Sequence, residues 1–173
     1  MIDVTLIDHM GTDLSVVNAA RVSFNKTSSW ELTDWRDSED YARKEVLSEA
    51  DTKLVNYLAK HKHTSPFGHC FASFHIKAPI FVARQLVKHK FLRWNEISRR
   101  YVDDEPEFYQ PDEWRGRSED KKQGSDGVVD VGKIGDISLA SKTLYNSLLD
   151  RGVAPEQARM VLPQNTMTEW YWS

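Results

Sequence analysis

The change of hydrophobic period at Pro79 constrains the fold of this chain more than any other feature. Before it, CFASFHIKA (residues 70–78) alternates in polarity as a strand does, because successive side chains of a strand point to opposite faces. After it, PIFVARQLVKHK (residues 79–90) has apolar residues at helical spacing. Proline suits the first turn of a helix because no amide partner is needed there. The sequence therefore predicts a strand that passes directly into a helix.

The other segments extend this mixture of helices and short strands. Residues 2–8 are typical of a strand, and residues 48–62 have Ala, Leu and Tyr at helical spacing until Ser65-Pro66 ends the pattern. We predict further helices in DLSVVNAARVSF capped by Asp13, in 134–151 closed by Gly152, and in PEQARMV between Pro155 and Pro163. NKTSSWELTDWRDSED (residues 25–40) is polar and is interpreted as a loop. Without βαβ alternation, this order favours the α+β class.

Length and composition favour a single domain over residues 1–173, because a chain of 173 residues with 40% apolar content can bury one sizeable core. GRSEDKKQGSDG, residues 116–127, has three glycines and no periodicity, which predicts a flexible surface loop. Cys70 is the one cysteine, so no intramolecular disulfide can form, and its alternating apolar surroundings predict a core residue. With no export signal or membrane-spanning stretch in the sequence, we expect a cytoplasmic protein.

Positive charge is concentrated in KHKFLRWNEISRRY, residues 88–101. This segment has five basic residues and one acidic residue, a charge of +4, while the whole chain carries −3, so the remainder carries −7. A general nucleic-acid binder usually spreads its basic residues over a face and has a basic pI, whereas this sequence has a pI near 6.1. The asymmetry instead favours a local pocket for an anion.

The polar residues of this region suit a nucleotide. The side chains of Lys88, Lys90, Arg99 and Arg100 suit phosphate, and those of Gln85, Asn95, Glu96 and Ser98 can recognise the nitrogens and carbonyls of a base. The alternative is that the charges form a solvated helix face with ordinary ion pairs.

HKHTSPFGH, residues 61–69, raises a metal site as a rival function. His61, His63 and His69 are candidate zinc ligands, but the sequence has no H-E-x-x-H motif, no cysteine pair and no nearby carboxylate. We therefore favour histidines at a helix end near exposed turns and predict no metal site.

Lys88-His89-Lys90, followed after seven residues by Ser98, resembles the signature of flavin-dependent thymidylate synthases, with lysines where the family usually has arginines. Five further segments are similar to family segments in the same order: DLSVVNAARVSF, HKHTSPFGH, FHIKAPIFVARQ, NEISRRY and GVAPEQARMVLPQNTMTEWYW. The resemblance covers most of the chain apart from residues 25–48 and the loop after Tyr109.

The resemblance implies that dUMP is methylated to dTMP, with methylenetetrahydrofolate as one-carbon donor, FAD as cofactor and NADPH as reductant. It also implies a fold in which helices pack with a small, mainly antiparallel sheet, and a homotetramer with active sites between subunits. The family has no cysteine nucleophile, which agrees with a buried Cys70. The alternative is a nucleotide- or nucleic-acid-binding fragment without catalysis; we expect no nucleic-acid or membrane partner.

Site residues are carried over from the family by position. The resemblance places the flavin near His63, Ser65, Lys88, His89, Lys90 and Glu96. It places dUMP near Gln85, Lys88, Glu96, Ile97, Ser98, Arg99, Arg100 and Arg159. Arg99 stands where the family has a small glycine, so its side chain must point away from dUMP or add a phosphate contact.

The family continues beyond the position of Ser173 with an Asn-x-Arg segment that grips FAD and with an arginine thought to ionise the uracil ring. We therefore expect that this chain lacks the family's carboxy-terminal part, and no catalytic residue is assigned within it. Three explanations stay open: a truncated product, one part of a split protein completed by a second chain, or a fragment that binds nucleotide without turnover. The aromatic end EWYW suggests that such a segment covers it.

Overall fold

The computed structural model describes residues 1–37, 40–120, 124–132 and 137–173. These residues form two compact units that are described separately below. The first unit comprises Met1–Thr5 and His75–Trp172, and the second comprises Leu6–Phe74 and Ser173. The expected single domain over residues 1–173 stays a prediction.

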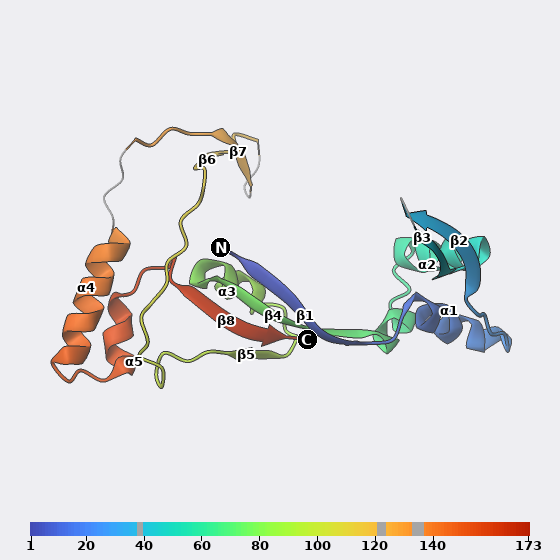
Figure 1. Cartoon of the computed structure of the whole chain (residues 1–173), viewed down its shortest axis with the longest axis horizontal. Helices are drawn as coiled ribbons and strands as arrows, with labels where there is room; N and C mark the ends of the chain where they lie inside the picture. The colour runs from blue at the N-terminus through green and yellow to red at the C-terminus, as the bar shows by residue number, and fades with distance from the viewer. Residues whose placement is uncertain (38–39, 121–123, 133–136) are drawn as a thin grey trace. The chain divides into compact units, whose positions relative to one another are not determined.

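A four-stranded sheet has the strand order β1-β4-β8-β5 (Figure 1). Its strands are β1 (Asp3–Met10), β4 (Phe71–Pro79), β8 (Met167–Trp172) and β5 (Trp94–Glu96). β5 pairs with β8 in antiparallel register, with Glu96 opposite Trp170. Trp170 is 1% exposed and its ring stacks on that of Trp94, with the ring centres 4.6 Å apart. Helices with a small, mainly antiparallel sheet confirm the predicted α+β class.

Strand β4 passes directly into helix α3 (Ile80–Leu86), as the change of period at Pro79 predicts. The first two amides of α3 donate to the chain just before β8, from Ile80 to the Thr166 carbonyl at 2.9 Å and from Phe81 to the Gln164 carbonyl at 3.1 Å. The prediction that this helix continues to Lys90 is wrong. After Leu86 the amides of Lys88 and His89 bond carbonyls three residues back, which tightens the chain into a turn.

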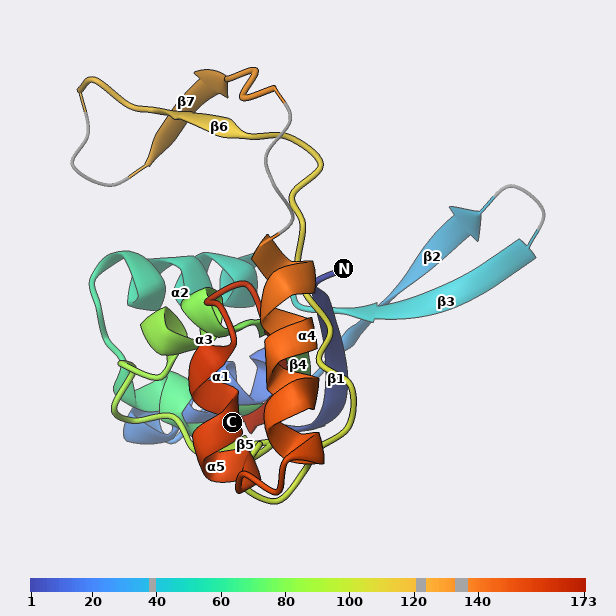
Figure 2. The same ribbon diagram turned by 90° about the vertical axis from the view of Figure 1, so that its left-hand side faces the viewer.

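The first unit also holds helix α4 (Ile137–Asp150), helix α5 (Pro155–Ala158) and the 3₁₀ turn η3 (Arg159–Val161). α4 packs beside α5 and η3 (Figure 2). Gly152 follows α4 with φ +80°, so its predicted role in closing the helix is confirmed. Residues 134–136 of the predicted helix lie outside the described residues.

The predicted loop at 116–127 has strand structure at both ends. β6 (Arg115–Arg117) pairs antiparallel with β7 (Ser125–Val128), and residues 121–123 lie outside the described residues. Flexibility of this segment stays a prediction.

The second unit contains helices α1 (Asp13–Arg21) and α2 (Glu49–Lys60), the 3₁₀ turns η1 (Val22–Phe24) and η2 (Ser65–His69), and strands β2 (Glu31–Asp37) and β3 (Asp40–Val46). The prediction of a loop over 25–40 is wrong, because β2 and β3 form an antiparallel ribbon. An exposed ribbon needs no apolar face, so its sequence lacks the alternation that reveals a half-buried strand; Leu32 is 63% exposed.

Two local predictions for this unit also need correction. The helix cap of α1 is Thr12 rather than Asp13, with the Thr12 amide bonded to Ser15 Oγ at 3.0 Å. Cys70 is half-buried rather than a core residue, and it lies just before β4, with its Sγ 3.4 Å from the Thr12 carbonyl oxygen. Gly11 lies so close that a Cβ atom there would be 2.8 Å from this sulfur, and the glycine's φ of +83° would also strain any other residue.

A buried carboxylate joins α1 to α2 in the second unit. Asp51 is 3% exposed and accepts hydrogen bonds from Arg21 Nε at 2.9 Å, Ser28 Oγ at 3.0 Å and Ser48 Oγ at 2.8 Å. Burial by itself raises the pKa of Asp51, but the hydrogen bonds from Arg21, Ser48 and Ser28 outweigh it and hold that pKa below its usual value. Across the described part of the chain, helices fall short of the length and apolarity needed to cross a membrane.

Candidate nucleotide site

A cavity of about 430 Å³ in the first unit is lined by α3, β5, the turn after β5, α5, η3 and β8. The lining residues that carry the argument are Arg84, Glu96, Ile97, Arg99, Arg159 and Thr168. Glu96, Ile97, Arg99 and Arg159 are all residues predicted to hold dUMP. Folding therefore brings four predicted residues to one cavity, although Arg159 is distant from the others in sequence; their role in binding stays a prediction.

Glu96 is held from three sides at this cavity. Its Oε1 accepts a hydrogen bond from Thr168 Oγ1 at 2.9 Å, and its Oε2 accepts one from Trp94 Nε1 at 3.2 Å. The guanidinium group of Arg84 lies 3.8 Å from Oε2. These partners fix the orientation of the carboxylate. The Glu96 side chain is still 20% exposed, so the carboxylate remains accessible to a ligand.

Arginine gives the cavity its positive character. Three arginines and two glutamates line it, and Arg84 is already paired with Glu96. Arg99 donates from Nη1 to the Asp104 carbonyl at 2.9 Å, and Arg159 donates from Nε to the Glu156 carbonyl at 3.2 Å. Within the described residues, these bonds leave further N–H groups of both guanidinium groups for a ligand. Their fork geometry suits the oxygens of a phosphate.

The four other predicted dUMP residues lie outside the lining of this cavity: Gln85, Lys88, Ser98 and Arg100. Ser98 begins the turn after β5, and its Oγ accepts from Arg100 Nε at 3.4 Å. The Arg100 guanidinium group lies 5.0 Å from the centre of the Tyr101 ring. Gln85 is exposed on α3. The structure thus places Ser98 and Arg100 together, but neither of them nor Gln85 among the residues that line the cavity.

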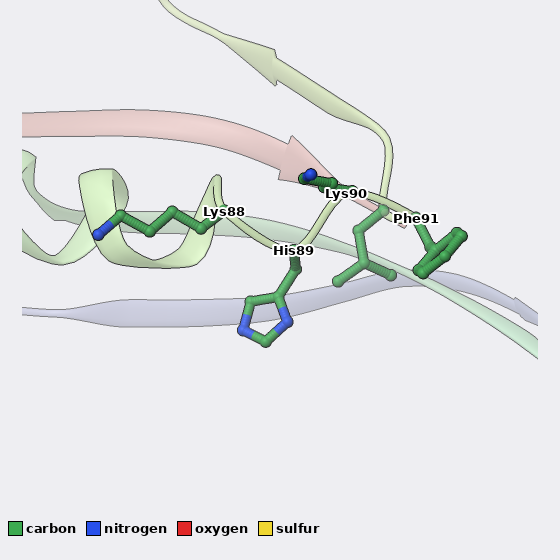
Figure 3. A pocket seen from close by; sticks show the side chains of 5 residues that line it. Lys88, His89, Lys90 and Phe91 are labelled. Carbon is green, nitrogen blue, oxygen red and sulfur yellow. The ribbon is translucent and has the colours of Figure 1, made fainter.

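A second hollow, of about 490 Å³, is lined by Lys88, His89, Lys90, Phe91 and Leu92. Phe91 is 97% exposed, and the His89 ring lies 6.1 Å from that of Trp172. The labelled side chains of Lys88, His89 and Phe91 diverge from one another (Figure 3). Exposed ammonium groups suit a pyrophosphate and the exposed ring of Phe91 suits a planar cofactor, so these residues fit the predicted flavin.

His63 and Ser65, the other predicted flavin residues, belong to the second unit. Both are exposed, and Ser65 begins η2. The rings of His61 and His63 lie 4.3 Å and 6.0 Å from the Tyr57 ring. In the described ranges, groups of three or more His, Cys, Asp or Glu side chains that could hold a metal ion are absent.

Glu169 of β8 belongs to an ion-pair network and does not line the cavity. Lys77 Nζ lies 2.8 Å from Glu107 and 3.6 Å from Glu169, and His75 lies 3.1 Å from Glu169. The hydrogen bond that Lys77 donates to Glu107 raises the pKa of Lys77 and lowers the pKa of Glu107. These groups connect β4 and β8 with the segment that follows the basic region.

The sequence analysis missed Arg84 and Thr168 as site residues. Arg84 precedes the predicted Gln85 and lies four residues before Lys88. This helical spacing could have indicated that Arg84 lies on the same side as the predicted residues. Thr168 is two residues before Trp170 and therefore shares its face of β8, but a threonine in an aromatic segment does not indicate a polar partner. Only the pairing of β5 with β8 reveals its contact with Glu96.

Residues 5–173 match the family described as Thymidylate synthase complementing protein. The chain belongs to this family. It is 40% identical to the flavin-dependent thymidylate synthase of Thermus thermophilus, covering 98% of this chain and 58% of that protein. It is 42% identical to the one from Thermotoga neapolitana, covering 98% of this chain and 69% of that protein. The family resemblance seen in the motifs is thus confirmed, and the chain spans between about half and about 70% of the curated relatives' lengths.

Solved structures agree with this family assignment. The crystal structure of the UMP/dUMP methylase PolB from Streptomyces cacaoi bound with 5-Br dUMP has a TM-score of 0.73 and 32% identity to this chain. That match covers 99% of this chain and 72% of PolB. The PolB structure bound with 5-Br UMP has the same TM-score at 30% identity. The predicted fold of the family is therefore confirmed over nearly the whole chain.

Proposed function

We propose that this chain provides the dUMP-binding part of an FAD-dependent thymidylate synthase that converts dUMP to dTMP. The observation that supports this most is the cavity that gathers Glu96, Arg99 and Arg159 from three separate segments. Two guanidinium groups and one fixed carboxylate match a small ligand with a phosphate at one end and neutral hydrogen-bond donors at the other. The names of the relatives and of PolB support dUMP as that ligand.

Each group of the cavity has a role in this proposal. Arg99 and Arg159 bind the phosphate and thereby fix the position of the nucleotide. Glu96 accepts a hydrogen bond from a sugar hydroxyl or a ring N–H, and its own three partners keep it from turning toward the other two arginines. The apolar side chains of Ile97 and Met160, which also line the cavity, exclude water beside the nucleotide.

The cofactors belong to the same proposal. Lys88, His89 and Lys90, with His63, Ser65 and Glu96, would hold FAD, which when bound supplies the hydride that reduces the transferred carbon. Methylenetetrahydrofolate donates that carbon, and NADPH is the reductant. We also propose a homotetramer with active sites between subunits.

The first experiment is to purify the chain, add FAD and titrate dUMP while recording the flavin absorption bands. We expect a perturbed flavin spectrum that saturates with dUMP. Arg159→Gln should weaken dUMP binding by roughly 10- to 100-fold, because it removes a charge-assisted contact, with a smaller effect on flavin. The matched control is Arg151→Gln, an exposed arginine in the turn after α4 that does not line the cavity.

The same titration tests the alternative of a nucleotide- or nucleic-acid-binding fragment without catalysis. That alternative predicts dUMP binding that is indifferent to FAD, or salt-sensitive binding to any polynucleotide. If dUMP leaves the flavin bands unchanged and Arg159→Gln binds dUMP as tightly as the unmodified chain, the proposed use of this cavity is wrong.

A further inference from the structure

The side chain of Thr168 makes the shortest contact of the Glu96 carboxylate at the cavity. Thr168 is 6% exposed, lies on β8 and donates from Oγ1 to Glu96 Oε1 at 2.9 Å. A hydrogen bond to an ionised acceptor is stronger than one between neutral groups. Because Thr168 also lines the cavity, its hydroxyl lies between the strand and the site where a ligand would bind.

The register of β5 and β8 makes this contact specific. Glu96 is opposite Trp170 and Trp94 is opposite Trp172, so Thr168 is the diagonal neighbour of Glu96 on the face where Trp94 stacks on Trp170. Trp94 in turn donates to Glu96 Oε2 at 3.2 Å. Thr168 and Trp94 therefore hold one carboxylate oxygen each, which fixes the rotation of the carboxylate plane.

The orientation of the Glu96 carboxylate matters because three arginines line the same cavity. Arg84 lies 3.8 Å from Glu96, and Arg99 and Arg159 line the same space. A freely rotating carboxylate would pair with the arginines that bind phosphate and neutralise them, since opposite charges attract strongly where water is partly excluded. A hydroxyl partner prevents this without adding charge.

We propose that Thr168 is a positioning residue, which holds Glu96 toward the nucleotide and away from Arg99 and Arg159. The inference deepens the proposed function and rests on it, because the ligand is taken to be dUMP. Thr168→Val keeps the shape of the side chain and removes the hydroxyl. It should weaken dUMP binding roughly tenfold. Thr168→Ser retains the hydroxyl and should restore dUMP binding to within about threefold of the unmodified chain.

Thr166 offers a matched control. It is fully buried just before β8, but its Oγ1 bonds the Pro163 carbonyl at 2.7 Å and does not contact Glu96. Thr166→Val makes the same substitution in a buried site of the same segment. If it weakens dUMP binding as much as Thr168→Val does, the effect comes from general loosening of β8 and the inference is overturned.

A measurement without ligand separates this inference from the proposed function. The indole N–H of Trp94 bonds Glu96, so its proton resonance, assigned with Trp94→Phe, reports the orientation of the carboxylate. We expect Thr168→Val to shift this resonance and Thr168→Ser to leave it near its original position; Thr168→Ala replaces the valine variant if the latter does not fold. An unchanged Trp94 resonance in the variant without the hydroxyl overturns the inference. If the unmodified chain binds no dUMP but Thr168→Val still shifts the Trp94 resonance, the proposed function is wrong and the positioning of Glu96 by Thr168 is supported.

Discussion

Arg99 stands where the family has a small glycine, so its side chain is a difference between this cavity and the one expected from the family. Its side chain lines the cavity while Nη1 is bonded to the Asp104 carbonyl at 2.9 Å, so it is fixed rather than directed away into solvent. Of the two arrangements expected from the sequence, we propose the one in which Arg99 adds a contact to a phosphate.

Arg99→Ala should therefore weaken dUMP binding about tenfold, because one charge-assisted hydrogen bond to phosphate is lost. The measurement is the dUMP titration at low and moderate salt. Arg93→Ala removes the same charge from the same basic segment but from a residue outside the cavity lining. Equal losses in the two variants would show that the effect is general electrostatic attraction rather than a contact in the cavity.

A substitution of Lys88 tests whether the second hollow binds the flavin. Lys88→Arg replaces a point charge by a planar fork that suits phosphate oxygens, and the exposed position of Lys88 leaves room for the larger group. We expect flavin affinity to be unchanged or up to about threefold higher, as measured by titration of the purified chain with FAD. A loss of flavin or dUMP affinity by more than about tenfold would show that the hollow is adapted to lysine.

Among the elements, α4 contains a buried polar group, the hydroxyl of Tyr145. Tyr145 is completely buried on α4, and within the described residues its hydroxyl has no hydrogen-bond partner. Such a group loses its hydrogen bond to water on folding. Tyr145→Phe should therefore raise the free energy of unfolding by about 0.5–1 kcal/mol, measured by urea denaturation. Destabilisation instead would indicate that the hydroxyl bonds a water molecule.

The buried carboxylate of Asp51, which links α1 to α2, should make the stability of the fold depend on pH. The pKa of Asp51 is lower in the folded chain than its usual value of 3.8, so its ionised form stabilises the fold above that pH. This contribution is lost as the pH falls through 3.8 toward the lower folded pKa. Asp51→Asn should cost about 2–3 kcal/mol at pH 7, less than for a fully buried pair because the Arg21 side chain is 25% exposed.

The measurement is urea denaturation of both proteins from about pH 7 down to about pH 3, a range that spans the usual pKa of an aspartate. The difference in unfolding free energy should shrink as the pH falls, since the unmodified chain loses its carboxylate and the Asp51→Asn variant has none to lose. A difference that stays constant over this range would contradict the assigned pKa direction.

For the whole molecule, charge distribution predicts the class of ligand. The chain carries −3 overall, whereas residues 88–101 are strongly basic. We expect single-stranded DNA to bind at least about 100-fold more weakly than dUMP at about 150 mM salt, because a polynucleotide would also meet the negative remainder of the chain. Fluorescence anisotropy with a labelled oligonucleotide checks this. Tight binding with a steep salt dependence would favour the nucleic-acid-binding alternative.

The α+β class, the strand that passes into a helix at Pro79, and the family were predictable from the sequence, because hydrophobic period and short motifs are local properties. The missed β2–β3 ribbon, the early end of α3 and the half-buried Cys70 show where local patterns fail. An exposed ribbon needs no apolar period, and a helix end depends on hydrogen bonds rather than composition.

The amino-acid sequence shows which residue types are available for a nucleotide: arginines, one glutamate and a basic segment in an acidic chain. The fold establishes which of them share a cavity. Pairing of β5 with β8 brought Thr168 to Glu96, and η3 brought Arg159 to the same space as Arg99. Contacts between residues distant in sequence depend on strand register and helix packing, which no local pattern encodes.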